Sequence, residues 1–398
     1  MQAIPQSHGN PRQLQVVRFL FFFQFAGVGI FISFINVYLR GTGLSGTQIG
    51  VLGMVSALFS LLCSTLWGYL SDRTGQPRLI LVIGAIGTAL VVQLYPLAKT
   101  MPAFLAISCL YGIFNSTSFT LVDSLALALL GDRREDYGRY RLGGSFGYIL
   151  TTSTSGLIFE RIGLAYMFPA FGVTSLLFIL TALLLPRRAT QPIPHKRGAV
   201  LQMIRQPAWL TLVGGVFLVW MAASGAFAFL NITLKDMGAS DSLIGLSLSV
   251  SAICEVPFMA FSGALIRRFG PSRLFWLSML GYLLRFILYS QMMSPEWAIA
   301  INAFSGPIYV LFWNSAINVA NRMAPPELSA TAQGLLVSAT ALAGVLSGVL
   351  SGWLFDKLGS RGLFLSLSGF CLAAFLLYGF GLLRNRGKLA ISPIKDQE

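Results

Sequence analysis

The sequence contains little charge, little histidine and no ATPase motif. Charged residues make up 11% of its 398 residues and hydrophobic residues 55%, whereas a soluble domain carries about 25% charged residues. The two histidines, His8 and His195, lie in polar segments, which leaves no Ser/His/Asp set inside the apolar sequence. No Walker A motif is present. These absences argue against a soluble domain, an ATP-driven pump and an enzyme.

Cysteine is scarce as well, and its positions exclude two further classes. The four cysteines all lie within apolar runs: Cys63, Cys109, Cys254 and Cys371. Their spacing fits neither a disulfide framework nor a zinc site, so we expect small buried hydrophobic side chains. The sequence therefore predicts no metal and no cofactor.

Long apolar runs dominate the sequence instead. About 20 apolar residues suffice to cross a bilayer as a helix, and runs of roughly this length recur along the whole chain. They predict an all-α integral membrane protein with twelve transmembrane helices, at about 15–39, 48–70, 79–98, 103–130, 142–160, 164–185, 208–233, 243–265, 274–292, 297–320, 329–355 and 362–383.

Basic residues are distributed unevenly between the two sides of these runs. A net charge of +14 would also suit a nucleic-acid-binding protein. However, 21 of the 28 Lys and Arg fall in the two terminal segments and the even-numbered connections, and only six on the other side. Basic residues favour the cytoplasmic side of a membrane. We therefore expect both termini in the cytoplasm, a bacterial inner-membrane location, contact with the lipid bilayer and no nucleic-acid partner.

The two halves of the chain repeat one another. Asn36-Val-Tyr-Leu-Arg40 returns as Asn231-Ile-Thr-Leu-Lys235, an offset of 195 residues. At an offset of 196, Gly156-x-x-Phe-Glu-Arg-x-Gly163 returns as Gly352-x-x-Phe-Asp-Lys-x-Gly359. Two apolar halves of one kind are typical of a secondary transporter with its site between them.

This repeat sets the expected domains. Residues 1–185 and 207–398 are predicted to form one six-helix bundle each, the second with a short cytoplasmic tail. Residues 186–206 are basic and proline-rich and are predicted to form a cytoplasmic linker. We expect the protein to be a monomer.

A glycine-rich loop motif stands between the second and third expected helices. Its sequence is Gly68-Tyr-Leu-Ser-Asp72-Arg73-Thr-Gly75-Gln-Pro-Arg78, and it resembles the cytoplasmic loop signature of the major facilitator superfamily. Gly68 permits close helix contact and Gly75 a tight turn, and Asp72 can accept hydrogen bonds from the amides at a helix N-terminus. We interpret these residues as a cytoplasmic gate; the alternative is a solvated turn.

Two ionisable residues fall near the middle of neighbouring expected helices. Glu255 lies about twelve residues into 243–265 and Arg285 about eleven into 274–292. A charge at that depth is costly unless it is paired or faces water, so we expect an ion pair between them. The pair is either a static contact between helices or a proton site in which Glu255 alternates between Arg285 and a proton.

Asp123 is a third intramembrane charge, on the expected helix 103–130. Arg141 begins the helix at 142–160, and an arginine side chain can extend over much of the intervening distance. We expect an Asp123–Arg141 pair that lines a cavity; an interfacial salt bridge is the alternative. The repeat-related position carries Asn318, so the fold does not require an acid there.

These residues define a closer resemblance, which covers nearly the whole chain. Asp123-Ser-Leu-Ala-Leu, Tyr137-Gly-Arg-Tyr-Arg141-Leu-Gly-Gly-Ser, Glu255-Val-Pro257 and Arg285 resemble the branch of lactose permease-like, nucleoside and phenylpropionate proton symporters. The resemblance implies alternating access and proton-coupled uptake. It also implies substrate contacts for Asp123 and Arg141 and proton coupling through Glu255 and Arg285. The histidine and glutamate that lactose permease uses on its tenth helix are absent.

Uncharged polar side chains complete the expected site. Amides can bind the hydroxyl or carbonyl groups of a substrate, or equally join two helices, and a tryptophan can stack on a ring. The candidate substrate contacts of this kind are Gln24, Asn36, Asn115, Asn231, Asn314, Asn318 and Trp313.

Together these observations predict a secondary active transporter of a small organic solute. The expected mechanism is alternating access with proton symport, with proton coupling by Glu255, Arg285 and Asp123. Sugars, nucleosides and aromatic acids are the candidate substrates. An uncoupled facilitator or an exporter of the same fold is the alternative, and a membrane enzyme or scaffold fits poorly because no extramembrane domain is visible.

Overall fold

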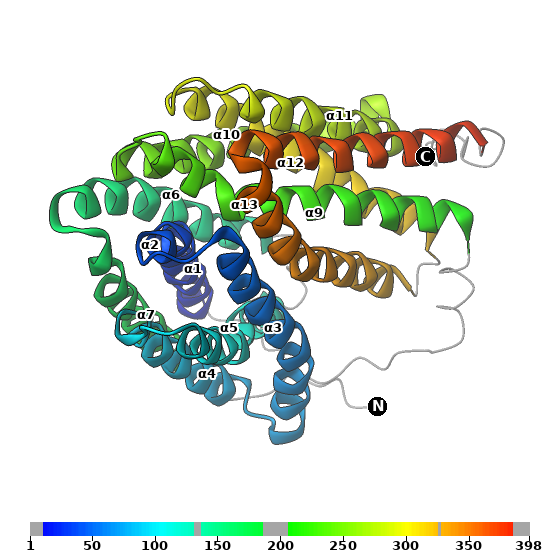
Figure 1. Ribbon diagram of the computed structural model, residues 1–398. Coiled ribbons are helices and arrows are strands. Elements are labelled where there is room, and N and C mark those ends of the chain that lie inside the picture. The colour runs from blue at the N-terminus through cyan, green and yellow to red at the C-terminus, as the bar shows by residue number, and fades with distance from the viewer. Residues whose placement is uncertain (1–10, 131–136, 186–205, 325–327, 385–398) are drawn as a thin grey trace, which may run out of the picture.

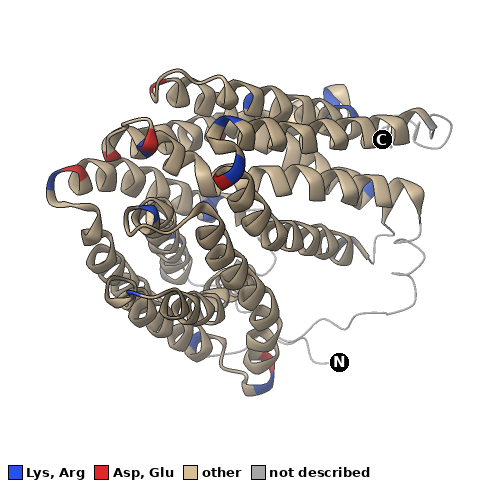
Figure 2. Cartoon of the chain, in the orientation of Figure 1, with Lys and Arg blue, Asp and Glu red and all other residues tan. Residues whose placement is uncertain are grey.

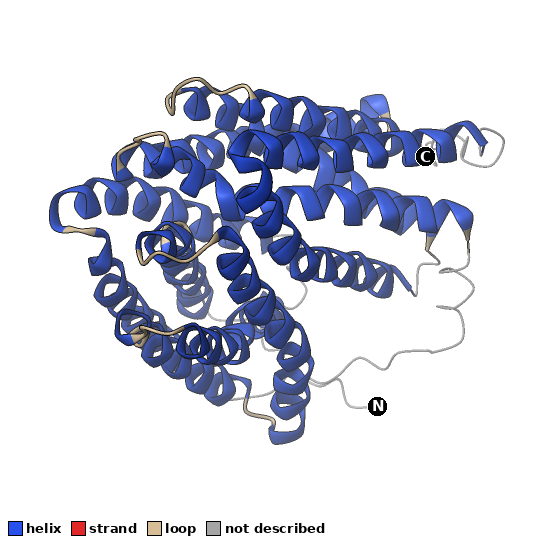
Figure 3. Cartoon of the chain, in the orientation of Figure 1, coloured by secondary structure: helices blue, strands red, loops and turns tan. Residues whose placement is uncertain are grey.

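The computed structural model describes residues 11–130, 137–185, 206–324 and 328–384, and within these ranges every regular element is helical (Figure 3). We call residues 11–185 the N-terminal half and residues 206–384 the C-terminal half. The N-terminal half contains α1 (Pro11–Gly27), the π-helical turn η1 (Val28–Ile32), α2 (Ile35–Gly41), α3 (Gly46–Thr74), α4 (Pro77–Val92), η2 (Tyr95–Leu97), α5 (Met101–Leu130), α6 (Tyr137–Ile162), η4 (Leu164–Tyr166) and α7 (Met167–Leu183). The C-terminal half contains α9 (Pro207–Asp236), α10 (Asp241–Phe269), α11 (Pro271–Ser290), α12 (Trp297–Met323) and α13 (Ser329–Arg384).

The helices coincide with the apolar runs of the sequence. In the described part of the chain, eight helical stretches are long and apolar enough to cross a membrane. One of them, in α13, holds the last two expected runs, and its backbone turns between them at Gly359 (φ 68°). The structure confirms an all-α fold with membrane-spanning helices, and the number of twelve spans stays a prediction.

The main contacts between the two halves are those of α3 with α13 and of α6 with α10, and α2 also contacts α9. We call the end of the molecule where α3 and α10 begin the closed end, and the end where α7 stops and α9 starts the linker end. From their contact at the closed end, the C-terminal end of α3 and the N-terminal end of α13 diverge from each other (Figure 1). The halves are therefore packed more tightly at one end than at the other.

Side-chain caps fix where the two contact helices begin. Ser45 and Gln48 form a capping box at the start of α3, with Ser45 Oγ accepting from Gln48 N at 3.2 Å. At the repeat-related position, Ser240 Oγ accepts from Leu243 N at 3.2 Å at the start of α10. These caps satisfy amides that a helix leaves unpaired, so both helices begin at repeat-related residues.

Small residues allow the halves to approach closely at this end. A Cβ atom on Gly50 of α3 would collide with the carbonyl oxygen of Gly348 of α13. The repeat-related contact is similar, because a Cβ on Gly245 of α10 would collide with the carbonyl oxygen of Thr152 of α6. Small residues at such positions let helix backbones touch inside a membrane.

Charged residues lie mainly near helix ends (Figure 2). Between those ends, large apolar side chains face outward, for example Leu66, Phe261 and Phe380, each more than 60% exposed. An apolar outer surface of this extent suits contact with lipid. The molecule therefore has a belt for the bilayer and polar groups at its ends.

Candidate functional site

Glu255 of α10 lies half-buried near the junction of the two halves. Arg141 of α6, in the other half, is the charged residue that acts on it electrostatically. The Glu255 charge also acts electrostatically on the hydroxyl groups of Tyr148 of α6 and Tyr309 of α12, and the Arg141 charge acts on Tyr309. The carboxylate of one half, the guanidinium of the other and these two phenol groups thus lie within electrostatic range of one another.

The backbone near Glu255 leaves little space on the α12 side. A Cβ on Gly306 of α12 would lie 2.9 Å from the Cα atom of Glu255, so this glycine allows the two helices to touch. Pro257, two residues further along α10, has no amide hydrogen and interrupts the helical hydrogen bonds there. Glu255 therefore lies at a locally weakened part of a helix that contacts the other half.

Arg285 does not pair with Glu255, which corrects the expected ion pair. Its Nε donates to the hydroxyl oxygen of Tyr289 at 3.1 Å, and no acid in the described residues lies within 4 Å of its guanidinium. The guanidinium lies 5.2 Å from the ring centroid of Tyr289 and 5.6 Å from that of Phe286. The charges of Glu255 and Arg285 both act electrostatically on Tyr282 of α11. The physical reason is that Arg285 turns toward aromatic rings of its own helix.

Asp123 likewise has a different partner from the one expected. Its Oδ1 accepts a hydrogen bond from the hydroxyl of Tyr137, at the start of α6, at 2.7 Å. Arg141 instead lies over the ring of Phe25, 5.8 Å from the centroid, and forms no ion pair within 4 Å among the described residues. Both Asp123 and Arg141 act electrostatically on Tyr137. The two charges thus lie within electrostatic range of the same phenol, which is bonded to Asp123.

Gln24 and Asn115 line a small cavity inside the N-terminal half. Its volume is about 40 Å³, and Thr88, Ser118 and Ser175 contribute further polar groups. The Oε1 atom of Gln24 is buried without a hydrogen-bond partner. Most of the remaining lining residues are apolar or aromatic. A cavity of this size is far smaller than a typical ligand pocket, so it does not accommodate a sugar or nucleoside in the observed conformation.

Asn36 and Asn231 make one reciprocal contact between the halves. Asn36 Nδ2 donates to the carbonyl oxygen of Ala228 at 3.0 Å, and Asn231 Nδ2 donates to that of Ser33 at 2.7 Å. All four residues lie near the closed end, and the two bonds are related by the 195-residue repeat. Both Nδ2 groups are therefore engaged in joining the halves in this conformation.

The candidate residues of α12 pack within the C-terminal half. Asn314 Nδ2 donates to Ser262 Oγ of α10 at 3.0 Å, and Asn318 Nδ2 donates to the carbonyl oxygen of Asn314 at 2.8 Å. The ring of Trp313 lies 5.6 Å from that of Trp220. The structure does not bring these three residues into one cavity with Gln24 and Asn115.

The loop signature at the linker end is open in this conformation. Gly75 has φ 64° and terminates α3, as a tight turn requires. Asp72 and Arg73 are exposed, and a Cβ on Gly68 would meet nothing within 4 Å. Arg78 Nη1 donates to the carbonyl oxygen of Leu185 at 2.9 Å, within its own half. The expected close helix contact at Gly68 is absent from the described structure.

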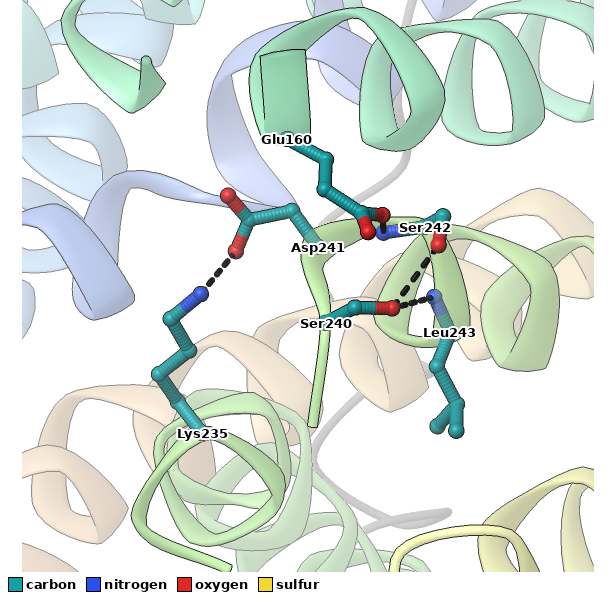
Figure 4. Close-up of polar contacts among 6 residues, drawn as sticks. All are labelled: Glu160, Lys235, Ser240, Asp241, Ser242 and Leu243. Atoms are coloured by element: carbon teal, nitrogen blue, oxygen red, sulfur yellow. Dashed lines mark hydrogen bonds and ion pairs between the residues drawn. The ribbon is translucent and has the colours of Figure 1, made fainter. Parts of the chain in front are cut away.

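An acid that contacts a helix N-terminus does exist, but at the opposite end. Asp356 of α13 accepts from the amides of Gly46 and Thr47 at 2.7 and 2.6 Å, and Glu160 of α6 accepts from the amide of Ser242 at 3.2 Å (Figure 4). Neither acid was among the expected site residues. Their place in the 196-residue repeat was the available signal.

Comparisons with known proteins agree with the fold. The chain is 28% identical over 320 residues to a maltose permease of Geobacillus stearothermophilus, covering 80% of each chain. It is 24% identical to the uncharacterized transporter YwbF of Bacillus subtilis (strain 168), covering 92% of this chain and 94% of that one.

Solved structures give the same architecture. A single-residue variant of the nucleoside transporter NupG superposes with a TM-score of 0.82 at 16% identity, covering 92% of this chain and 99% of that one. A family model described as the MFS_1 like family matches residues 14–366. Because this match covers most of the chain, the protein belongs to the MFS_1 like family and is a major facilitator superfamily transporter of small molecules.

Proposed function

We propose that the protein is a proton-coupled symporter in the bacterial inner membrane, with its linker end in the cytoplasm. The single observation that carries the coupling is the position of Glu255, a half-buried carboxyl of one half within electrostatic range of Arg141 of the other. When the halves move relative to each other, the distance between this acid and its counter-charge changes. Such a change alters how readily the carboxyl holds a proton.

The conformation supports alternating access by two six-helix bundles. Hydrogen bonds and glycine contacts join the halves at the closed end, whereas the signature loop at the linker end makes no close contact at Gly68. With the linker end in the cytoplasm, this arrangement is inward-facing. Transport would then require the closed end to open and the linker end to close in the other half of the cycle.

A hydroxylated solute is the proposed substrate class, with sugars and nucleosides ahead of aromatic acids. Relatives named as a maltose permease and a nucleoside transporter support this order. Asn314 and Asn318, together with the tyrosines near Glu255, offer donors and acceptors of the kind that hydroxyl groups need.

The decisive experiment combines a substrate screen with one substitution. Thermal-shift measurements on purified protein with maltose, uridine and phenylpropionate select a substrate, whose uptake into proteoliposomes is then measured under an imposed pH gradient. Glu255→Gln is expected to abolish uphill accumulation while retaining counterflow. The control is Glu296→Gln, because Glu296 is exposed and contacts its own half. Accumulation that survives in Glu255→Gln would favour the uncoupled facilitator.

A further inference from the structure

We propose that Asp356 and Glu160 are gating residues of the transport cycle, which hold the closed end shut by each capping a helix of the opposite half. Asp356 Oδ1 accepts from Gly46 N at 2.7 Å, and Oδ2 accepts from Thr47 N and Thr47 Oγ1, both at 2.6 Å. Glu160 Oε2 accepts from Ser242 N at 3.2 Å. Each acid belongs to one half and each amide to the other.

The chemistry of a helix N-terminus explains why these contacts stabilise closure. The first amides of a helix have no intrahelical acceptor and carry a partial positive charge. A carboxylate that accepts from them forms charge-assisted hydrogen bonds, which are stronger than neutral ones. Opening the closed end separates each acid from its helix, so these bonds exist in one state of the cycle and not in the other.

The two caps are related by the internal repeat of the chain. Asp356 and Glu160 are 196 residues apart, and Thr47 and Ser242 are 195 apart. Small residues next to each cap support it, because a Cβ on Gly352 would collide with the carbonyl oxygen of Gly46 and one on Gly156 with that of Asp241. The same kind of helix cap thus occurs at both the α3–α13 contact and the α6–α10 contact, which is not expected of a chance surface contact.

The two caps differ in their hydrogen bonds, so the loss of each acid is expected to have an effect of different size. Asp356 makes three short hydrogen bonds to α3. Glu160 accepts from the amide of Ser242 at the longer distance of 3.2 Å, with Ser240 and Ser242 hydroxyls also acting on it, and it lies beside Asp241, whose charge is paired with Lys235 at 2.6 Å (Figure 4). Lys235 also attracts Glu160. The loss of Asp356 should therefore favour opening more than the loss of Glu160.

The test measures the distance between the halves at the closed end, without substrate or a proton gradient. Spin labels at Lys99 and Met293, exposed loop positions of the two halves at this end, report opening by pulsed electron resonance in nanodiscs. In the protein used for labelling, the four native cysteines are replaced by serine or alanine. Asp356→Asn is expected to raise the ratio of open to closed molecules about fivefold, with a smaller rise for Glu160→Gln.

Two further variants keep the test decisive. Glu296→Gln, which removes an exposed acid with contacts inside its own half, should leave the distance distribution unchanged. If Asp356→Asn does not fold, Thr47→Val removes the hydroxyl donor alone and should shift the ratio in the same direction. The proposal would be overturned if Asp356→Asn gave the same distance distribution as the wild type. If Asp356→Asn does not fold, an unchanged distribution in Thr47→Val would overturn it. The proton-coupling role of Glu255 would be unaffected, because that role is measured separately.

Discussion

Arg285 and Tyr289, one helical turn apart on α11, form a hydrogen bond of 3.1 Å from Nε to the hydroxyl oxygen. The same hydroxyl donates to Oδ1 of Asn302 on α12 at 2.7 Å. A guanidinium inside the C-terminal half is thus held by neutral groups and aromatic rings. This network orients Arg285 and joins α11 to α12.

Tyr289→Phe should destabilise the protein without changing its shape. The substitution leaves Arg285 Nε and Asn302 Oδ1 without their partner, and an unsatisfied buried polar group costs about 1–3 kcal/mol. A lower melting temperature in detergent would show this. Tyr282→Phe is the matched control, because no hydrogen bond to another described residue is found for the Tyr282 hydroxyl. Equal melting temperatures for the two variants would contradict the prediction.

Arg141 should matter more than Arg285 for proton coupling. Arg141 is the cation that acts on Glu255, whereas Arg285 is bonded to Tyr289. Arg141→Gln is therefore expected to reduce accumulation driven by a pH gradient by about tenfold or more, as for the loss of one coupling interaction of about 1.4 kcal/mol. Arg285→Gln should reduce it less. The measurement compares the accumulation of the two variants in proteoliposomes. A larger loss in Arg285→Gln than in Arg141→Gln would contradict this assignment.

Asp123 and Tyr137 should behave as one unit in substrate binding. Asp123→Asn is expected to weaken affinity, because the carboxylate that accepts from Tyr137 is lost. Tyr137→Phe should weaken it by a smaller factor in the same direction, and Tyr140→Phe serves as control. Isothermal titration with the screened substrate measures the effect. If Asp123→Asn binds as tightly as wild type, the residue is structural.

Gly50 should tolerate no side chain, in contrast to Gly53 one turn later. A Cβ on Gly50 would collide with the Gly348 carbonyl oxygen, whereas one on Gly53 meets nothing within 4 Å. Gly50→Ala should disfavour the closed end by about 1–3 kcal/mol and slow transport. Gly53→Ala should be neutral or slightly stabilising, because alanine suits a helix better than glycine. Transport rates that match in both variants would refute the argument.

Sequence patterns predicted the all-α fold and the positions of the apolar helices, because both rest on local chemistry. Apolar length decides whether a segment can cross a bilayer, and an offset of 195 residues is visible without coordinates. The pairing of the intramembrane charges was not predictable in the same way. Arg285 could extend toward Glu255 or toward Tyr289, and a linear sequence carries no side-chain direction.

The sequence by itself determined that this is an apolar, twofold-repeated helical chain of a transporter family. Only the tertiary structure decided that Glu255 lies within electrostatic range of Arg141 of the other half and that the acids at 160 and 356 cap helices across the interface. The physical reason is that helix formation and bilayer insertion depend on neighbours within a few turns. Contacts between the halves depend instead on how the two folded halves are oriented relative to each other, which no local pattern specifies.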